Sequence, residues 1–114
     1  MCTVIIATRV WSELPLLVAS NRDEALARPS LPPSRWRDGM VAPRDERAGG
    51  TWIGVSDVEV VAAVTNRFGP TADPARRSRG ELVPMALEAP SAEEAARRIA
   101  RISPATYNPF HLLV

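Results

Sequence analysis

The sequence lacks lysine altogether and holds one cysteine, one histidine and few aromatic residues. With arginine as its only strong base, the chain has a formal net charge of +1, and this balance predicts no nucleic-acid partner. A single cysteine excludes an intramolecular disulfide, so a reducing, cytoplasmic location is expected. Because that cysteine and the histidine lie far apart in the sequence, they show no metal-ligand spacing, and neither a metal nor another cofactor is expected.

Long apolar runs are also missing from the sequence. No run approaches the roughly 20 residues that span a bilayer, and residues 3–7 are too few for the core of a signal peptide. No transmembrane segment is therefore expected. The 114 residues are 46% hydrophobic and 24% charged, as in an ordinary soluble domain with a modest core. Nothing in the pattern predicts an oligomeric state.

Two strand pairs are predicted in the first two thirds of the chain. Residues 2–8 and 14–19 are apolar and predict two antiparallel strands with a turn between them. Residues 49–55 and 58–64 predict a second hairpin around the turn Ser56-Asp57. Between these pairs, residues 28–48 contain four prolines and are expected to form a long irregular segment.

Helical signals occur in the last third. Residues 81–87 predict a helix, although Pro84 is expected to kink it or delay its start. Ser91 and Glu94 form a capping box ahead of alanines and isoleucines at helical spacing. Strand pairs followed by helices predict an α+β fold with antiparallel sheets. The chain then ends inside the strand-like stretch 110–114, so we expect it to be the N-terminal portion of a longer domain.

Cys2 is the leading chemical candidate. Removal of Met1, which a small second residue permits, would leave a thiol and a free α-amine on one residue. The thiolate can attack a carbonyl carbon, and the amine, with a pKa of about 7.7–8.0, can accept the thiol proton near neutral pH. The alternative is that Cys2 serves as a small buried hydrophobic residue, the commoner use of a lone cysteine.

A dense polar cluster follows the second predicted strand. If the first two strands pair, Asn21, Arg22 and Asp23 lie beside the start of the first strand, within reach of Cys2. Asp23 is then a candidate partner for the terminal amine, and Arg22 could lower the pKa of the thiol. Asn21 and Arg22 are also candidate substrate-binding residues. The alternative is a hydrogen-bonded turn in which Asn21 and Asp23 satisfy backbone groups.

Asn66 completes the predicted catalytic set of Cys2, Asp23 and Asn66. It follows the strand 58–64 and could present its side-chain amide as an oxyanion donor. The alternative is an ordinary turn residue. His111 is expected to be a core or edge histidine rather than a ligand.

Seven short motifs occur along the chain in order: Met1-Cys2, residues 19–24 (ASNRDE), Arg28-Pro29, residues 49–54 (GGTWIG), Thr65-Asn66, residues 79–83 (RGELV) and residues 107–110 (YNPF). Each motif alone is moderately specific, but the ordered set closely resembles the NRDE family, also called the transport and Golgi organisation protein 2 family. Members of that family are considerably longer. Residues 1–114 are therefore interpreted as the N-terminal portion of a single domain of this kind.

That family in turn looks like the N-terminal nucleophile hydrolases, especially the penicillin V acylase and bile salt hydrolase branch. The resemblance implies part of an αββα four-layer sandwich and cleavage of non-peptide C–N amide bonds. By the same resemblance, Cys2 would be the nucleophile and, through its amine, the base. Asp23 would orient the amine, and Asn66 would be a candidate oxyanion donor.

The sequence departs from the acylase pattern in two respects. Ser20 stands nearest to the position of an acylase arginine, while Arg22 lies on the other side of Asn21. The later asparagine and arginine of the acylase site would fall beyond Val114.

Two classes of function remain open at this stage. The first is an amidohydrolase that acts on a small-molecule amide. The second is a non-enzymatic protein that handles a haem-like, lipid or acyl-CoA ligand, because members of the family are associated with haem trafficking and lipid homeostasis. For haem, Cys2 or His111 would be the candidate axial ligand. A third possibility is an inactive part of a domain with exposed apolar strands.

Overall fold

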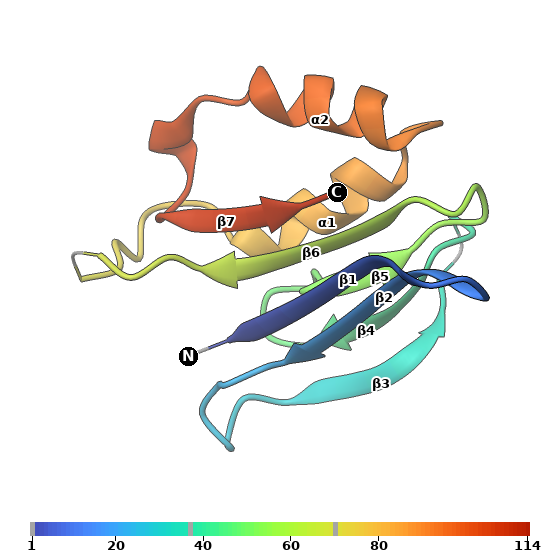
Figure 1. The fold of residues 1–114 in the computed structure, drawn as a ribbon. Helices are drawn as coiled ribbons and strands as arrows, with labels where there is room; N and C mark the ends of the chain where they lie inside the picture. The colour runs from blue at the N-terminus through green and yellow to red at the C-terminus, as the bar shows by residue number, and fades with distance from the viewer. Residues whose placement is uncertain (1, 37, 70) are drawn as a thin grey trace.

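The computed structural model describes residues 2–36, 38–69 and 71–114, which form two antiparallel β-sheets and two α-helices (Figure 1). The strands are β1 (Thr3–Trp11), β2 (Leu14–Asn21), β3 (Ser30–Arg35), β4 (Val41–Asp45), β5 (Ile53–Val55), β6 (Val61–Asn66) and β7 (Phe110–Leu113). The helices are α1 (Leu82–Leu87) and α2 (Ala92–Ala100), accompanied by the short 3-10 helices η1 (Arg79–Glu81) and η2 (Pro104–Thr106). The predicted α+β class with antiparallel sheets is confirmed.

Strands β1 and β2 form a two-stranded sheet of their own. Thr3 pairs with Asn21 and Ile6 with Val18, so the predicted antiparallel pair is confirmed. Both strands run further than expected, because pairing continues to Trp11 on one strand and to Asn21 on the other. The register also brings the residues that follow Asn21 next to the start of β1.

The second sheet has the strand order β3-β4-β5-β6-β7. The prediction of an irregular segment over residues 28–48 was wrong, because β3 and β4 lie within it. Proline is tolerated on an edge strand or at a bulge, and β3 provides both. Its register with β4 shifts between Leu31 and Ser34, and Pro32 and Pro33 occupy that irregularity.

The helices follow the local signals closely. Pro84 lies in the first turn of α1, where the missing N–H has no intrahelical acceptor, so it neither kinks nor ends the helix. The side chain of Ser91 accepts a hydrogen bond from the backbone N–H of Glu94 at 3.2 Å, which confirms the predicted cap of α2.

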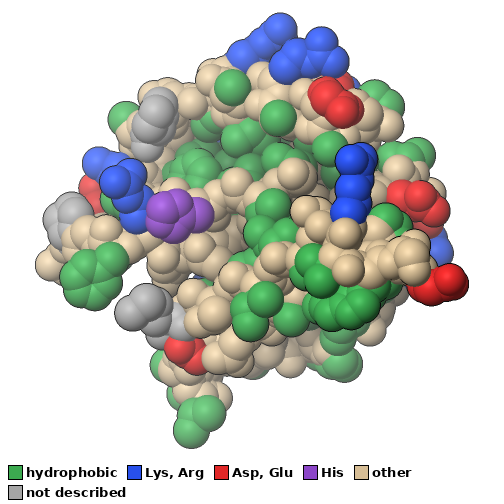
Figure 2. Space-filling view, viewed as in Figure 1, with side chains coloured by type: hydrophobic (Ala, Val, Ile, Leu, Met, Phe, Trp, Pro, Cys, Tyr) green, Lys and Arg blue, Asp and Glu red, His purple; other side chains and the backbone are tan. Residues whose placement is uncertain are grey.

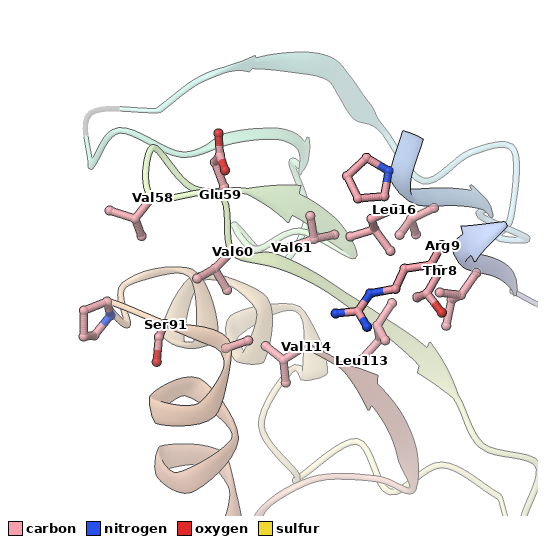
Figure 3. A pocket seen from close by; sticks show the side chains of 15 residues that line it. Thr8, Arg9, Leu16, Val58, Glu59, Val60, Val61, Ser91, Leu113 and Val114 are labelled. Carbon is pink, nitrogen blue, oxygen red and sulfur yellow. The ribbon is translucent and has the colours of Figure 1, made fainter. Parts of the chain in front are cut away.

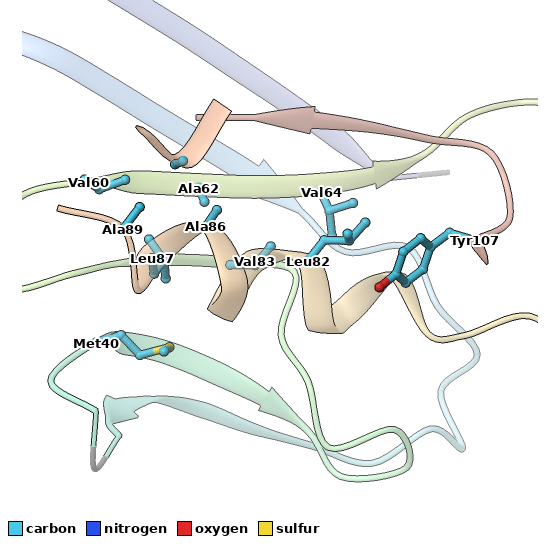
Figure 4. Close-up of a cluster of buried hydrophobic side chains, with 11 residues drawn as sticks. Met40, Val60, Ala62, Val64, Leu82, Val83, Ala86, Leu87, Ala89 and Tyr107 are labelled. Carbon is cyan, nitrogen blue, oxygen red and sulfur yellow. The ribbon is translucent and has the colours of Figure 1, made fainter. Parts of the chain in front are cut away.

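The hydrophobic core lies between the five-stranded sheet and the helices (Figure 4). Small residues let α1 approach the sheet closely: a methyl group at Gly54 would come within 2.8 Å of Leu87 and 3.0 Å of Ala42. The core residues are Met40, Val60, Ala62, Val64, Leu82, Val83, Ala86, Leu87, Ala89, Ala95 and Tyr107.

The β1–β2 hairpin lies across the opposite face of the five-stranded sheet (Figure 1). Alternation along the strands turns Val4 and Ile6 toward the sheet, where they line cavities, and turns Ile5 away from it. Ile5 is 61% exposed, and apolar side chains are visible on this surface in the space-filling view (Figure 2). Among the described residues, no helix is long and apolar enough to cross a membrane.

Candidate active site around Cys2

Cys2 lies immediately before β1, and the polar cluster that follows β2 lies beside it. The register that pairs Thr3 with Asn21 brings this cluster to the thiol, as the sequence hypothesis required. The Cys2 Sγ atom is 3.9 Å from the backbone carbonyl oxygen of Asp23. Cys2 is half-buried, so its thiol is neither sealed in the core nor fully solvated.

The side chain of Asp23 lies at the amino terminus of the chain. The side-chain amide of Asn21 donates a hydrogen bond to Asp23 Oδ1 at 2.7 Å. The N-terminal ammonium group lowers the pKa of Asp23, first through a hydrogen bond and then through its charge, with a smaller contribution from Asn21. Asp23 is therefore held as a carboxylate, the form that can orient an amino group.

Arg22 interacts with the side chains of Asp45 and Trp52. Its Nη2 donates to Asp45 Oδ2 at 3.1 Å, and its guanidinium carbon lies 4.6 Å from the ring centroid of Trp52. The sequence hypothesis assigned Arg22 to the thiol or to substrate. In the structure Arg22 borders the same cavity as Cys2, but its charge is already engaged by a carboxylate and an aromatic face.

Asp45, which the sequence reasoning missed, lines the cavity and binds several of its neighbours. It is 8% exposed and accepts hydrogen bonds from Arg22 and from the backbone N–H groups of Arg47 and Ala48. Arg28 adds an ion pair at 2.8 Å. Burial alone would raise the pKa of Asp45, but the bonds from Arg28 and the backbone outweigh burial and hold the pKa below its ordinary value.

Asn66 ends β6 on the same side of the molecule. Its backbone pairs with Phe110 of β7, and its exposed side chain makes no hydrogen bond to any residue that the structure describes. Asn66 and Cys2 line one cavity of about 590 Å³. The structure thus brings Cys2, Arg22 and Asn66 to one cavity, while Asn21 and Asp23 lie behind Cys2.

Arg79 is a second residue that the sequence reasoning missed. It lies in η1, is half-buried, and donates from Nη1 to the carbonyl oxygen of Pro109 at 2.9 Å. Burial lowers the pKa of its guanidinium, and the nearby charge of Arg28 lowers it further, whereas negative charge at Cys2 and at Glu24 raises it. Arg79 stays charged, because the ordinary pKa of arginine is far above neutrality.

Cys2 also borders a second, apolar cavity of about 340 Å³ between β1 and the strands β6 and β7. His111 lines this cavity from the edge strand β7, and its exposed ring agrees with the predicted edge position (Figure 2). No group of three or more histidine, cysteine or carboxylate side chains that could hold a metal ion occurs within residues 2–36, 38–69 and 71–114.

The missed residues carried only a weak signal in the sequence. Arg28 and Arg79 belong to the ordered motifs, yet their sequence neighbours gave no reason to assign them a role. Asp45 stands in a run of charged residues that is typical of a solvated turn. Its role arises because the backbone folds back at Gly49 and Gly50, which encloses the carboxylate.

Comparison with known proteins places the chain in a family. A family model described as transport and Golgi organisation 2 matches residues 1–114. Similar proteins include the transport and Golgi organization 2 homologs of Mus musculus and Homo sapiens, each 38% identical over 73 residues, and the Bos taurus homolog, 36% identical over 73 residues. The matched region covers 60% of this chain and 26% of each relative. The family predicted from the ordered motifs is therefore confirmed, and the chain belongs to the transport and Golgi organisation 2 family.

Proposed function

We propose that the Cys2 site is that of an N-terminal-cysteine amidohydrolase, which cleaves a non-peptide C–N bond of a small-molecule amide. The observation that carries this proposal is the position of the Cys2 thiol. The Cys2 Sγ atom lies 3.9 Å from the backbone carbonyl oxygen of Asp23, and the side-chain carboxylate of Asp23 interacts with the amino terminus. Cys2 also borders an open cavity that Asn66 lines.

The reaction would use Cys2 twice. Once Met1 has been removed, the amine of Cys2 accepts the thiol proton, and the thiolate adds to the carbonyl carbon of the amide. Asn66 donates a hydrogen bond to the developing oxyanion. The C–N bond then breaks, and the leaving amine takes the proton back from the ammonium group, which leaves an acyl thioester. Water attacks the thioester, releases the carboxylic acid and restores the thiol.

Asp23 would act as the positioning residue of this site. Its carboxylate already interacts with the amino group of the chain, and the Asn21 amide holds it from the other side. Removal of Met1 moves the amino group onto Cys2, one residue closer to Asp23 along the chain. The interaction would keep the amine directed at its own thiol.

The layers of the fold support the same proposal. Two antiparallel sheets face one another, and helices cover the outer face of one of them (Figure 1). This arrangement corresponds to three layers of the proposed αββα sandwich. The outward face of the hairpin, where Ile5 and Leu17 are exposed, would lie under the remaining helical layer.

The proposal predicts a processed, reactive cysteine. Intact mass should show loss of Met1, and iodoacetamide should alkylate Cys2 rapidly near neutral pH. With an acyl amide as substrate, Cys2→Ala should abolish hydrolysis, and Asn66→Ala should lower kcat by about 10²–10³-fold with little change in KM. Hydrolysis that persists in Cys2→Ala, or a mature chain that retains Met1, contradicts the proposal.

A second candidate function is the handling of a lipid or acyl-CoA ligand without catalysis. A groove of about 770 Å³ opens between the hairpin and the larger sheet, and apolar side chains such as Leu16, Val60 and Leu113 line it (Figure 3). Such a groove can take a hydrocarbon chain. Tight binding of a fatty acyl ligand with no turnover, unchanged in Cys2→Ala, would favour this function over hydrolysis.

Haem is another ligand that this non-enzymatic function could handle. Cys2 and His111 line one cavity, and both residue types serve as axial ligands of haem iron. Titration of the protein with haem should then give a Soret band that shifts in Cys2→Ala or His111→Ala. A band identical in both variants would exclude axial ligation by these residues. The cytoplasmic location expected from the sequence remains a prediction.

A further inference from the structure

Cys2 lies where two cavities of opposite character meet. On one side is the cavity of about 590 Å³ that holds Arg22, Asn66 and Arg79. On the other side is the apolar cavity of about 340 Å³, which Val4 and the strands β6 and β7 enclose. A ligand whose reacting carbonyl reaches Cys2 would therefore extend into both environments.

The apolar side continues well beyond Cys2. Ile6 and Leu113 line the cavity next to Cys2 and also the groove of about 770 Å³ between the hairpin and the larger sheet (Figure 3). The two spaces thus adjoin at these side chains. The path along them from the thiol is lined mostly by apolar residues, although Arg9 and Glu59 also line the groove. A long unbranched hydrocarbon chain fits such a path, because each buried methylene contributes about 0.8 kcal/mol.

The polar side is strongly cationic. Six arginines and three carboxylates line it: Arg22, Arg28, Arg47, Arg76, Arg77 and Arg79 against Glu24, Asp45 and Asp73. Four of the six arginines form ion pairs with carboxylates, and Arg47 is exposed to water. The excess positive charge of this cavity favours an anionic ligand.

Arg79 is the half-buried arginine of this cavity that forms no ion pair with a carboxylate among the described residues. Its hydrogen-bond partner among the described residues is the neutral carbonyl of Pro109. The charge of Arg28 disfavours the charged form of Arg79, whereas negative charge at Cys2 and Glu24 favours it without forming an ion pair. A partly buried guanidinium that forms no ion pair is costly, and a carboxylate matches its planar donor fork. An anion that enters beside Cys2 would relieve both costs.

We propose that the ligand of this site is an N-acyl amino acid, with its long acyl chain between the two sheets, its amide carbonyl at Cys2 and its free carboxylate on Arg79. This inference rests on the proposed amidohydrolase function, and it names the substrate class of that site. The products would be a fatty acid and an amino acid.

Binding is the test, because it does not require turnover. N-dodecanoylglycine and its neutral counterpart N-dodecanoylglycinamide are titrated calorimetrically into the Cys2→Ala protein. We expect the carboxylate ligand to bind at least about tenfold more tightly, as for hydrogen bonds between charged groups. Adding Arg79→Gln should remove this preference and leave the affinity for the neutral amide unchanged, whereas Arg79→Lys should retain part of it. Arg97→Gln on α2, an exposed arginine paired with Glu94, is the charge-matched control and should change neither affinity.

The acyl path has its own matched pair of variants. Ile6→Glu places a charge in the path and should weaken N-dodecanoylglycine binding at least about tenfold. Ile5→Glu places the same charge on the outward face of β1 and should leave binding unchanged. N-Acetylglycine, which lacks the long chain, should bind at least about a hundredfold more weakly, given the free energy of burying methylenes.

The two proposals fail in different ways. If the carboxylate ligand and the neutral amide bind Cys2→Ala equally, or if Arg79→Gln keeps the preference, the substrate class is wrong, whatever the unmodified protein hydrolyses. If the preference and its loss in Arg79→Gln are observed but the unmodified protein releases no glycine from N-dodecanoylglycine, the ligand class stands and the amidohydrolase proposal fails.

Discussion

Among single residues, Asp45 bears most on the architecture of the site. It joins Arg22 from one motif to Arg28 from another and takes two further hydrogen bonds from backbone N–H groups. Arg22 is therefore fixed against Trp52 and cannot move freely toward the thiol. The hypothesis that Arg22 lowers the thiol pKa stays a prediction, and Arg79 is the half-buried arginine of the cavity without an ion pair among the described residues.

Asp45→Asn should lower the free energy of unfolding by about 2 kcal/mol, because two partly buried guanidinium groups lose their carboxylate. Denaturant unfolding measures this loss. The matched control is Asp57→Asn, which breaks the exposed Arg35–Asp57 pair, whose side chains are 63% and 59% exposed. Exposed pairs contribute at most about 1 kcal/mol. Equal losses in the two variants would show that Asp45 is not structurally special.

The contribution of Asp45 should also appear in the pH dependence of stability. The pKa of Asp45 in the folded protein is below its ordinary value of 3.8, so its stabilising contribution is complete above that pH. The contribution is lost as pH falls through the lowered pKa. Stability of the unmodified protein should therefore fall below about pH 4, and Asp45→Asn should show a shallower acid limb. Parallel acid limbs would contradict this assignment.

At the scale of elements, contacts between backbone segments position the site. The loop before β5 packs against η1 through a hydrogen bond from the Thr51 N–H to the Gly80 carbonyl at 3.0 Å. Gly50 makes this approach possible, since a methyl group there would come within 2.5 Å of the Gly80 backbone. Arg79, the neighbour of Gly80, owes its position beside Cys2 to this contact.

Gly50→Ala should therefore destabilise the protein by about 1–3 kcal/mol, because neither backbone segment can yield without strain. It should also weaken the binding of a ligand carboxylate that depends on Arg79. Gly69→Ala is the control, since a methyl group there meets Pro109 at an ordinary 3.7 Å. Thermal unfolding of both variants tests the prediction, and a Gly50→Ala protein as stable as Gly69→Ala would refute it.

At the scale of the whole molecule, the two sheets face each other across incompletely filled space. The radius of gyration is 14.1 Å, against about 13 Å for a compact domain of this length. The helices cover one side of the larger sheet, and the hairpin covers the other side loosely. Apolar side chains such as Ile5 and Leu17 remain exposed on the hairpin.

This exposed face predicts concentration-dependent self-association. The double substitution Ile5→Thr with Leu17→Thr should raise the concentration at which light scattering increases, because both side chains lie on the outward face and threonine preserves the strand. Val58→Thr changes an exposed residue outside the hairpin, 58% exposed, and should have no such effect. Scattering that is unaffected by the double substitution would exclude the hairpin face as its source.

Local signals in the sequence predicted much of the fold. The apolar runs that form β1 and β2, the cap at Ser91 and the strand that begins at Phe110 all depend on neighbouring residues, and all were confirmed. Strands β3 and β4 were missed because their prolines disfavour a strand locally. Only pairing at a sheet edge with a bulge accommodates them.

The sequence alone determined the family, the α+β class and the neighbourhood of Cys2 and Asp23, because ordered motifs and a single hairpin are local properties. The tertiary structure decided which charged side chains form ion pairs and which remain available to a ligand. Asp45 engages Arg22, whereas Arg79 forms no ion pair with a carboxylate among the described residues. That difference depends on distances between segments far apart in the chain, and residue type alone carries no information on such distances.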